Sequence, residues 1–325
     1  MRLGIYLDGR NPDPWARPWP DFYRRQVELV VEAERLGADS VWLSEHHLFP
    51  DGYLPQPLTL AAALAARTER IRLGTAVLLA PLWNPVRLAE EIAVVDNLSG
   101  GRVVVGLGAG YARDEFELYG ADHGRRYGRT DETYREVRRL LGPDGPITPP
   151  AMQRPPELWL GYQGPQGARR AGLLGAPLLS TNPVVLEPYR AGLVEAGHRA
   201  DAARMAGVVT VVVADDPDEA FERVLPHALH QINTYRDAAA AGTGRVPSPV
   251  TADKLRSARH EHTNVLSPLE VLTPGQAIDW LRTRVEGLPV EEVFCWASVA
   301  GMPDDLVDRH LSLWLAEVRP AVADL

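Results

Sequence analysis

The sequence lacks the features that mark several large classes of protein. Its one cysteine, Cys295, excludes an intrachain disulfide and leaves no cysteine partner for a zinc site. Cys295 stands in the apolar run 293–296, which is typical of a small buried core residue and not of a nucleophile. No run approaches the roughly 18 apolar residues of a membrane span, so we expect no transmembrane segment.

A basic surface is missing as well. The formal net charge is -9 and the pI is about 5.5, whereas nucleic acids and anionic membranes require a positively charged face. Residues 1–8 have the character of a strand and not the charged-then-apolar pattern of an export signal. We therefore expect a cytoplasmic protein that binds neither nucleic acid nor a membrane.

What the sequence does contain is a regular alternation of short apolar stretches with longer stretches of helical period. This pattern is typical of βα units around a parallel sheet. We expect strands at 2–8, 39–46, 71–80, 102–108, 157–161, 176–181, 207–214 and 291–297. We expect helices at 20–37, 57–68, 85–98, 128–141, 165–174, 183–197, 216–240, 273–287 and 302–318. This set of strands fits a closed (β/α)8 barrel, although periodicity alone leaves an open doubly wound sheet possible.

The chain shows no internal boundary between domains. No composition shift or long linker divides it, so residues 1–325 are expected to form a single domain. Two stretches interrupt the alternation: 142–156 is rich in proline, and 241–272 is polar and too long for an ordinary connection. Because the active site of a barrel lies where its strands end, we expect 241–272, an insertion near the last strand, to form a lid.

The second expected strand ends in the polar residues Glu45, His46 and His47. Burying such groups at an apolar barrel mouth destabilises a fold unless they serve a function. Successive strand residues point to opposite faces, so both histidines cannot point inward, which argues against a metal site. We expect one inward histidine, His46, to act in acid–base chemistry with support from Glu45; a purely structural histidine is the alternative.

Two glycine-rich turns follow later strands. Turns of this kind let the backbone approach a flat or phosphorylated ligand closely, and free N–H groups at a helix start can bind phosphate. The relevant residues are Gly108, Ala109, Gly110 and Tyr111 in the first turn and Gly161, Tyr162, Gln163 and Gly164 in the second. Neither turn has the G-x-G-x-x-G spacing of a Rossmann nicotinamide site. A turn that needs glycine for its geometry alone is the alternative.

A third motif, His260-Glu261-His262, has the residue types of a metal site. Its spacing does not suit a pair of ligands on one helix face. We expect a solvated or substrate-facing loop there and no bound metal.

Several segments, in their order and spacing, resemble the bacterial-luciferase-like family of flavin-dependent monooxygenases. They include Val-Trp-Leu-Ser-Glu-His-His at 41–47 and Gly-Leu-Gly-Ala-Gly-Tyr at 106–111, and continue at 73–77, 84–91, 96–102, 115–116, 158–161 and 272–274. The resemblance implies a (β/α)8 barrel that binds flavin at the carboxyl ends of its strands. It does not cover 220–270, and it says little about the substrate.

The same resemblance implies roles for individual residues. His46 matches the active-site histidine of the family, with Glu45 or His47 expected to orient it. Ala76 and Val77 match a position where relatives often have a non-proline cis peptide beneath the flavin ring. The turns at 108–111 and 161–164 match flavin-facing and phosphate-end segments.

Two residues depart from the pattern of the family. Ala109 stands where relatives can place a phosphate-binding arginine, and Asn84 stands where many have histidine. Weakened FMN binding is therefore expected, with the phosphate contacts coming from elsewhere in the chain.

The function implied is that of an FMNH2-dependent monooxygenase. A separate reductase would supply FMNH2, O2 would add to form a flavin C4a-hydroperoxide, and one oxygen atom would enter a small organic substrate, for example in secondary metabolism. The protein would bind the flavin and exclude water. The resemblance also implies a homodimer, formed through the helices at 57–68 and 85–98.

Two alternatives remain open at this stage. An F420-dependent oxidoreductase would transfer hydride, and the acidic tail of F420 would require a basic groove, for which the candidates are Arg125, Arg126, Arg129, Arg169 and Arg170. A non-catalytic flavin-binding barrel is the second alternative. The retention of Glu45 and His46 argues against it, because a structural barrel gains nothing from burying them.

Overall fold

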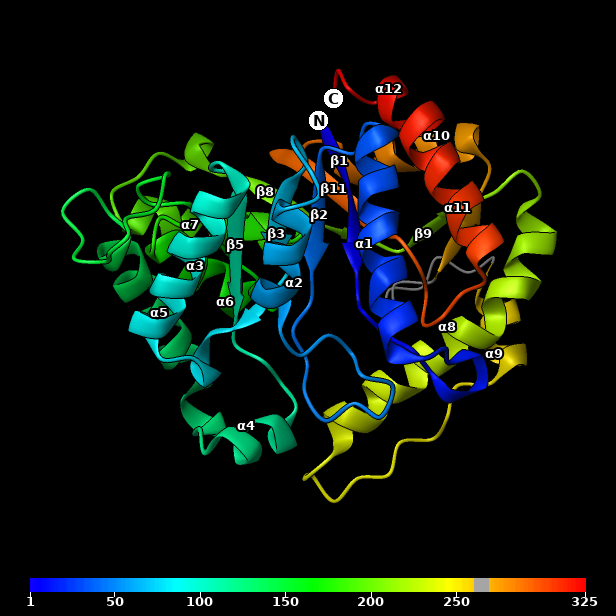
Figure 1. Cartoon of the computed structure of the whole chain (residues 1–325), viewed down its shortest axis with the longest axis horizontal. Coiled ribbons are helices and arrows are strands. Elements are labelled where there is room, and N and C mark those ends of the chain that lie inside the picture. The colour runs from blue at the N-terminus through cyan, green and yellow to red at the C-terminus, as the bar shows by residue number, and fades with distance from the viewer. Residues whose placement is uncertain (260–268) are drawn as a thin grey trace.

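The computed structural model describes residues 1–259 and 269–325, and a closed barrel of parallel strands lies at its centre (Figure 1). The eight strands are β1 (Arg2–Leu7), β2 (Ser40–Leu43), β3 (Arg72–Thr75), β5 (Val103–Gly108), β6 (Glu157–Leu160), β7 (Leu178–Leu179), β8 (Met205–Val209) and β11 (Val290–Trp296). They pair in the order β3-β2-β1-β11-β8-β7-β6-β5, and pairing of β3 with β5 closes the ring. The expected (β/α)8 barrel is confirmed.

Helices cover the outside of the barrel, and several begin at capping residues that the sequence makes recognisable. The side chain of Asn84 accepts hydrogen bonds from the backbone at the start of α3, and Thr273 forms a capping box with Gln276 at the start of α10. The helices are α1 (Trp19–Arg35), α2 (Pro57–Ala65), α3 (Pro85–Ser99), α4 (Arg113–Tyr119), α5 (Arg126–Leu140), α6 (Gly164–Leu173), α7 (Leu186–Glu195), α8 (Pro217–Ala240), α9 (Ala252–Ala258), α10 (Pro274–Val285), α11 (Asp304–Leu313) and α12 (Arg319–Ala321).

Two of the expected strands are each divided in the structure. The stretch 71–80 forms β3 and then β4 (Leu78–Leu79), with a cis peptide bond between Ala76 and Val77 separating them. The stretch 207–214 contributes to β8 and to β9 (Val211–Val213), and β9 pairs in parallel with β10 (Glu270–Leu272) outside the barrel.

The strand β10 falls within 241–272, where the sequence predicts a lid and no strand. Three residues are too few to produce a recognisable period of two. The described remainder of this stretch contains α9, and the motif His260-Glu261-His262 lies outside the described residues.

The amino ends of the strands form a floor of buried charge. Glu292, which is 1% exposed, accepts from Trp42 Nε1 at 2.6 Å and pairs with Arg72 at 2.8 Å and with Arg2 at 2.9 Å. Above this cluster the rings of Trp42 and Phe294 stack at 4.7 Å and fill the barrel interior. Because the floor is sealed and its charges are paired, a ligand can enter only at the opposite end.

The two ends of the chain meet near this floor. The amino group of Met1 donates to the carbonyl of Ala323 at 2.9 Å. The helix α4 and the carboxyl-terminal half of α8 lie at the other end of the barrel (Figure 1). Within the described residues, no helix combines the length and the apolar character needed to cross a bilayer.

Candidate active site at the carboxyl ends of the strands

A cavity of about 370 Å³ opens at the carboxyl ends of the barrel strands, and we call it the first cavity. Most of the residues that the sequence singles out line it together: Glu45, His46, Ala76, Val77, Gly108, Ala109, Gly110, Tyr111, Gly161, Tyr162 and Gln163. Two of them do not. His47 points away from the cavity, and Gly164 opens the helix α6 beside it. One histidine of the pair therefore lines the cavity, as expected, although both follow the end of β2 at Leu43 and lie outside the strand.

Glu115, and not Glu45 or His47, orients the inward histidine. Nδ1 of His46 lies 2.9 Å from Oε1 of Glu115, which also accepts the backbone N–H of His47 at 2.9 Å. The expectation that Glu45 or His47 performs this role is wrong. Nε2 of His46 has no hydrogen-bond partner among the described residues, and the ring lies edge-on to Tyr53, with centroids 4.6 Å apart.

Glu45 instead fixes the chain around the cavity. Its carboxylate accepts from the backbone of Leu79 at 2.6 Å, from Trp83 Nε1 at 3.0 Å and from His47 Nε2 at 3.1 Å. The other ring nitrogen of His47 lies 3.3 Å from the hydroxyl of Tyr119. Glu45 and His47 therefore hold β4 and α4 in place, which satisfies the buried carboxylate without a ligand.

The cis peptide bond expected between Ala76 and Val77 is present. The side chain of Val77 that follows it packs against two glycines. A Cβ on Gly108 would lie 2.3 Å from Cγ2 of Val77, and a Cβ on Gly161 would lie 2.4 Å from Cγ1. Neither distance is possible for real atoms, so both turns need glycine to accommodate Val77 beside the cavity.

The helix α6 begins at the far edge of the first cavity. The side chain of Gln163, at its N-cap, makes no capping hydrogen bond, so the first N–H groups of the helix are left without a side-chain partner. The hydroxyl of Tyr162 donates to Oδ1 of Asp131 at 2.5 Å, and Arg170 pairs with the other oxygen of Asp131. Burial and the hydrogen bond with Asp131 raise the pKa of Tyr162, so the tyrosine stays protonated.

Four of the five arginines that are candidates for a basic groove pair with carboxylates. Arg125 and Arg129 both pair with Glu132, while Arg169 pairs with Glu195 and Arg170 with Asp131. Arg126 is the exception. It stacks on the ring of Tyr127 with its guanidinium carbon 4.5 Å from the centroid, and it has no carboxylate partner among the described residues.

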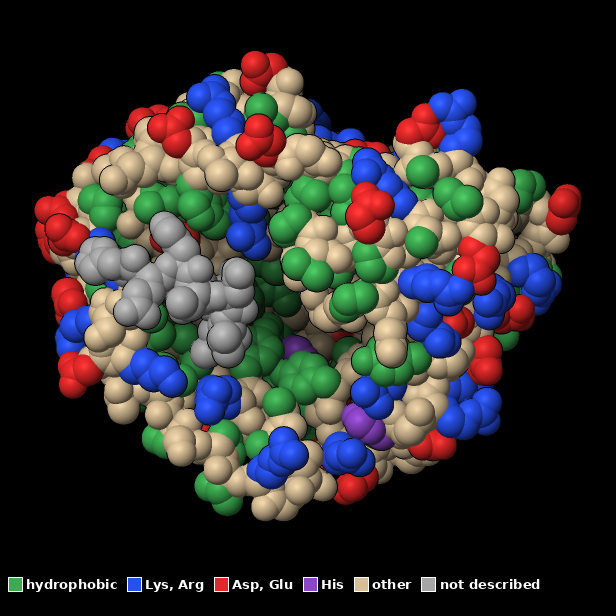
Figure 2. All heavy atoms as spheres, turned by 180° about the vertical axis from the view of Figure 1, so that it is seen from behind, with side chains coloured by type: hydrophobic (Ala, Val, Ile, Leu, Met, Phe, Trp, Pro, Cys, Tyr) green, Lys and Arg blue, Asp and Glu red, His purple; other side chains and the backbone are tan. Residues whose placement is uncertain are grey.

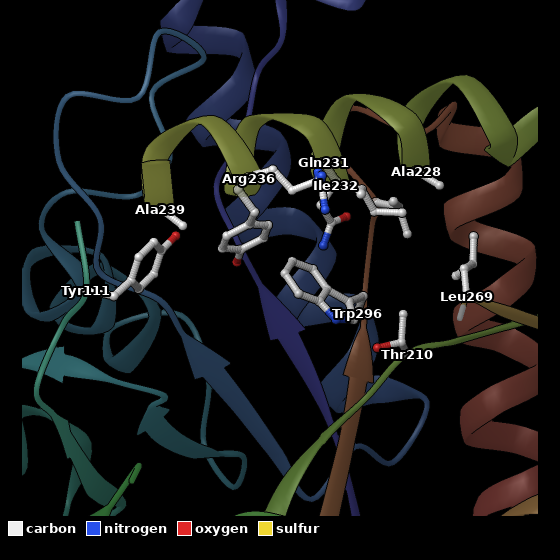
Figure 3. Close-up of a pocket in the computed structure, with 11 residues that line it drawn as sticks. Tyr111, Thr210, Ala228, Gln231, Ile232, Arg236, Ala239, Leu269 and Trp296 are labelled. Carbon is white, nitrogen blue, oxygen red and sulfur yellow. The ribbon is translucent and has the colours of Figure 1, made fainter. Parts of the chain in front are cut away.

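A second cavity of about 390 Å³ adjoins the first. The two share the side chains of Tyr111, Tyr235 and Trp296, which form the wall between them. The remaining lining residues of the second cavity are Thr210, Ala228, Gln231, Ile232, Arg236, Ala239, Leu269 and Val299, arranged along α8 and across from it (Figure 3). A space-filling view shows a hollow with hydrophobic walls and a histidine side chain deep inside it (Figure 2).

Comparisons with known proteins agree with this geometry. The sequence profile of a family described as "Luciferase-like monooxygenase" matches residues 1–291. The chain belongs to the luciferase-like monooxygenase family. It is 29% identical to the 4-hydroxyprotoasukamycin monooxygenase of Streptomyces nodosus subsp. asukaensis over 289 residues, 78% of this chain and 75% of that protein. The predicted family is confirmed, and so is the prediction of a flavin-dependent monooxygenase enzyme.

Two further similarities define the range of this family. The monooxygenase RslO1 from Streptomyces bottropensis superposes with a TM-score of 0.79 at 25% identity, covering 98% of this chain and 99% of that one. An F420-dependent glucose-6-phosphate dehydrogenase from Amycolatopsis mediterranei is 31% identical over 185 residues, 51% of this chain and 56% of that protein. The oxygenase component of a flavin-dependent trigonelline monooxygenase from Acinetobacter baylyi is 38% identical over 95 residues, 29% of this chain and 26% of that protein. The relatives of this chain therefore include both a flavin-dependent and an F420-dependent enzyme.

In this luciferase-like barrel, sequence reasoning misses a buried polar network behind His46. The side chain of Arg10 is 0% exposed, donates to Asp51 at 2.7 Å, and donates to Thr234 of α8 at 2.5 Å. His230, also on α8, lies 2.8 Å from the same carboxylate. Arg10 follows the first strand, and this position could have identified it as a candidate site residue. Nothing in the sequence connects Arg10 to Asp51 or to α8.

A tyrosine pair completes this network at the wall of the first cavity. The hydroxyls of Tyr53 and Tyr235 are hydrogen-bonded to each other, and the guanidinium carbon of Arg10 lies 4.9 Å from the ring centroid of Tyr53. Burial raises the pKa of both tyrosines. They therefore act as neutral hydrogen-bonding groups, and Tyr235, on α8, lines the first cavity beside His46.

Proposed function

We propose that this protein is an FMNH2-dependent monooxygenase that inserts one oxygen atom of O2 into a small organic substrate. One observation carries the proposal: a single cavity brings together the inward His46, the cis peptide at Ala76–Val77 and the open start of α6. A flavin mononucleotide has a flat ring system and a phosphate, and these features suit the two ends of that cavity.

The residues present fit FMN. Gly108 and Gly161 keep Val77 against the barrel wall, where a larger residue would push it into the space for a flat ring. The free N–H groups at the start of α6 suit a phosphate, because helix N-termini favour anions. Since Ala109 offers no arginine at the expected place, these backbone groups would be the main phosphate contacts, with Gln163 beside them.

When bound, reduced FMN supplies the two electrons with which one oxygen atom enters the substrate and the other leaves as water. The side chain of His46 can exchange a proton at Nε2, because its Nδ1–H donates to Glu115 and the lone pair of Nε2 faces the cavity. Tyr111, Tyr235 and Trp296 separate this space from the second cavity. We expect the substrate to occupy the second cavity and to approach His46 past this wall.

An F420-dependent hydride transfer is the competing function, since one relative uses that cofactor. F420 carries a long acidic tail that needs uncompensated positive charge. Four of the five arginines that could supply it already pair with the carboxylates of Glu132, Asp131 and Glu195. The arrangement therefore favours FMN.

The proposed partners are a flavin reductase and a second copy of the chain. A reductase is required because neither glycine-rich turn provides a nicotinamide site, so reduced flavin must come from elsewhere. For the homodimer, α3 exposes the apolar side chains of Val86, Val94 and Leu98, of which Leu98 is 56% exposed. Sedimentation analysis of the purified protein would show whether a dimer forms.

The decisive experiment mixes the protein, loaded anaerobically with FMNH2, with oxygenated buffer and follows flavin absorbance over time. We expect a lag between oxygen uptake and the appearance of oxidised FMN, and a shorter lag in His46→Ala. A titration with F420, followed by fluorescence quenching, runs in parallel. Oxidation of FMNH2 at its free rate together with tight F420 binding would contradict the proposal.

A further inference from the structure

The second cavity presents a nearly continuous apolar lining to whatever occupies it. Its walls are formed by side chains from α8, with Ala228 and Ile232 among them, and by Leu269, Trp296 and Val299 (Figure 3). No aspartate or glutamate is among the described residues that line it. Its volume of about 390 Å³ lies in the range of pockets for small organic molecules.

Three polar atoms of the residues that line this cavity are buried without partners: the hydroxyl of Tyr111, Oε1 of Gln231 and Nε of Arg236. Gln231 is 8% exposed, and its buried Oε1 has no hydrogen bond to any described residue. Nε of Arg236 is buried without a partner as well, although its Nη2 donates to the carbonyl of Ser248 at 3.2 Å. Buried donors and acceptors are rarely left unpaired, because each one destabilises the folded state. Gln231 and Arg236 stand five positions apart on α8, and both line the same cavity, where a hydrogen-bond acceptor of a ligand could pair with the guanidinium of Arg236.

Among the described residues that line the second cavity, Arg236 is the one that carries a charge. Arg236 also borders a shallow hollow that Arg113 and Arg245 line, and none of the three has a carboxylate partner among the described residues. Arg223, on the same helix, is by contrast paired with Asp305. Arg236 thus lines the second cavity without a carboxylate partner among the described residues, and Arg113 and Arg245 lie in the adjoining hollow, which favours an anionic ligand.

We propose that the second cavity selects a substrate with an apolar body and one carboxylate group. The carboxylate lies against Arg236 and the amide of Gln231, and the apolar body packs between Ile232 and Trp296, directed at the cavity that His46 lines. Gln231 lines the same cavity, and its amide N–H groups can donate to the second carboxylate oxygen. This assignment rests on the proposed function, which places the flavin in the first cavity.

Three probes with one shared ring system test the charge preference. Isothermal titration calorimetry on the full chain without flavin would compare 2-naphthoate, 2-naphthamide and 2-naphthylmethylammonium. We expect 2-naphthoate to bind about tenfold more tightly than the neutral amide, as a charge-assisted hydrogen bond implies. The ammonium probe should bind most weakly. Equal affinities for the three probes, or a preference for the amide, would overturn the proposal.

Three variants test whether the probes bind in the second cavity, against Arg236. Arg236→Met keeps the apolar stem of the side chain and removes the charge, so it should abolish the preference for 2-naphthoate while the affinity for 2-naphthamide stays the same within about twofold. Arg223→Met, the same substitution at the exposed ion pair of α8, should change neither affinity. Ile232→Trp fills the second cavity and should block both probes. An unaltered preference in Arg236→Met shows that the proposed contact does not exist.

The outcomes separate this proposal from the proposed function. Arg236 and Ile232 do not line the first cavity, so FMN affinity should be unchanged in both variants. If FMN fails to bind but 2-naphthoate shows the expected preference, the cofactor assignment fails and the substrate assignment stands. Should Arg236→Met not fold, Gln231→Leu provides a second test, because it must also reduce the preference for 2-naphthoate.

Discussion

Glu115 holds the ring of His46 through a hydrogen bond of 2.9 Å to Nδ1, although the two residues belong to different βα units. Glu115 is 1% exposed and lies on α4, which follows β5. A carboxylate accepts hydrogen bonds, so Nδ1 carries the proton, and the lone pair of Nε2 is presented to the cavity. The tautomer of His46 is therefore set from outside its own loop.

The first prediction concerns this pair. His46→Gln should shorten the lag between oxygen uptake and the appearance of oxidised FMN by about 10–100-fold, because the reacting oxygen loses the stabilising hydrogen bond of the imidazole, and a charge-assisted hydrogen bond contributes about 1.5–3 kcal/mol. Glu115→Gln retains an acceptor oxygen but loses the charge, so it should shorten the lag by about tenfold. Stopped-flow absorbance measures both variants.

A control is available at a histidine outside the cavity. His230→Gln alters the network at Asp51 without touching the first cavity, and we expect it to leave the lag near that of the unaltered protein. A lag in Glu115→Gln that equals the original lag would show that the carboxylate has no role beyond packing.

The second prediction concerns the glycines that receive Val77. Gly108→Ala places a Cβ 2.3 Å from Cγ2 of Val77, so the valine must move toward the space for the flavin ring. Overpacking of this kind typically costs about 1–3 kcal/mol. Since Val77 relieves the overlap by moving into the space for the flavin ring, FMN binding restores the overlap, and we expect a loss of about 5- to 150-fold in FMN affinity. Gly275→Ala is the matched control, because its Cβ would meet nothing within 4 Å. Fluorescence titration with FMN should separate the two variants; similar dissociation constants would contradict the argument.

Much of the fold could be predicted from the sequence, because alternation of strands and helices is a local property. The points at which two of the expected strands are divided could not be predicted. The cis bond at Ala76–Val77 ends β3 without any change in apolar pattern, so periodicity extends the strand to 80. The strand β10 depends on pairing with β9, a contact between segments almost sixty residues apart, and its three residues carry no pattern of their own.

The candidate site divides in the same way. Residues that follow strands, such as His46, are found from position alone. The roles of Glu115 and Asp51 could not be predicted, because the residues that they contact lie far away in the sequence. Arg170 misleads for the same reason: it follows a glycine-rich turn, as a phosphate ligand would, yet Asp131 of another helix pairs with it.

The third prediction tests the buried ion pair between Arg10, after β1, and Asp51, after β2. Arg10→Met leaves Asp51 buried beside His230 without its guanidinium, and loss of one partner of a buried pair costs about 3–5 kcal/mol of unfolding free energy. Arg17→Met breaks a surface pair with Asp304 and should cost less than about 1 kcal/mol. Urea unfolding measures both values. Equal losses in the two variants would mean that the Arg10 pair contributes no more than an exposed one.

The last prediction concerns His310, which is fully buried on α11. Its Nδ1 accepts the backbone N–H of Val213 at 2.9 Å, and its Nε2 lies 3.1 Å from the carbonyl of Trp296. A neutral imidazole makes both hydrogen bonds, because one of its ring nitrogens accepts and the other donates. Burial lowers the pKa of His310 to about 4, from an ordinary value near 6.5.

The sign of the pH effect follows from these values. As the pH falls below about 6.5, the unfolded chain binds a proton at His310 that the folded chain does not bind until about pH 4. The free energy of unfolding therefore decreases across this window, by up to about 3 kcal/mol from this one residue. His310→Asn keeps an acceptor for the N–H of Val213 and cannot titrate.

Urea unfolding at about pH 7 and about pH 4.5 should show a smaller loss of stability in His310→Asn than in the unaltered protein. The comparison isolates His310, because other buried groups titrate in both proteins. Asp8 is one of these: burial raises its pKa to about 6, so its contribution runs in the opposite direction and stabilises the fold as the pH falls. Parallel losses in the two proteins would mean that His310 accepts a proton in the folded state as readily as in the unfolded one, which its two hydrogen bonds do not permit.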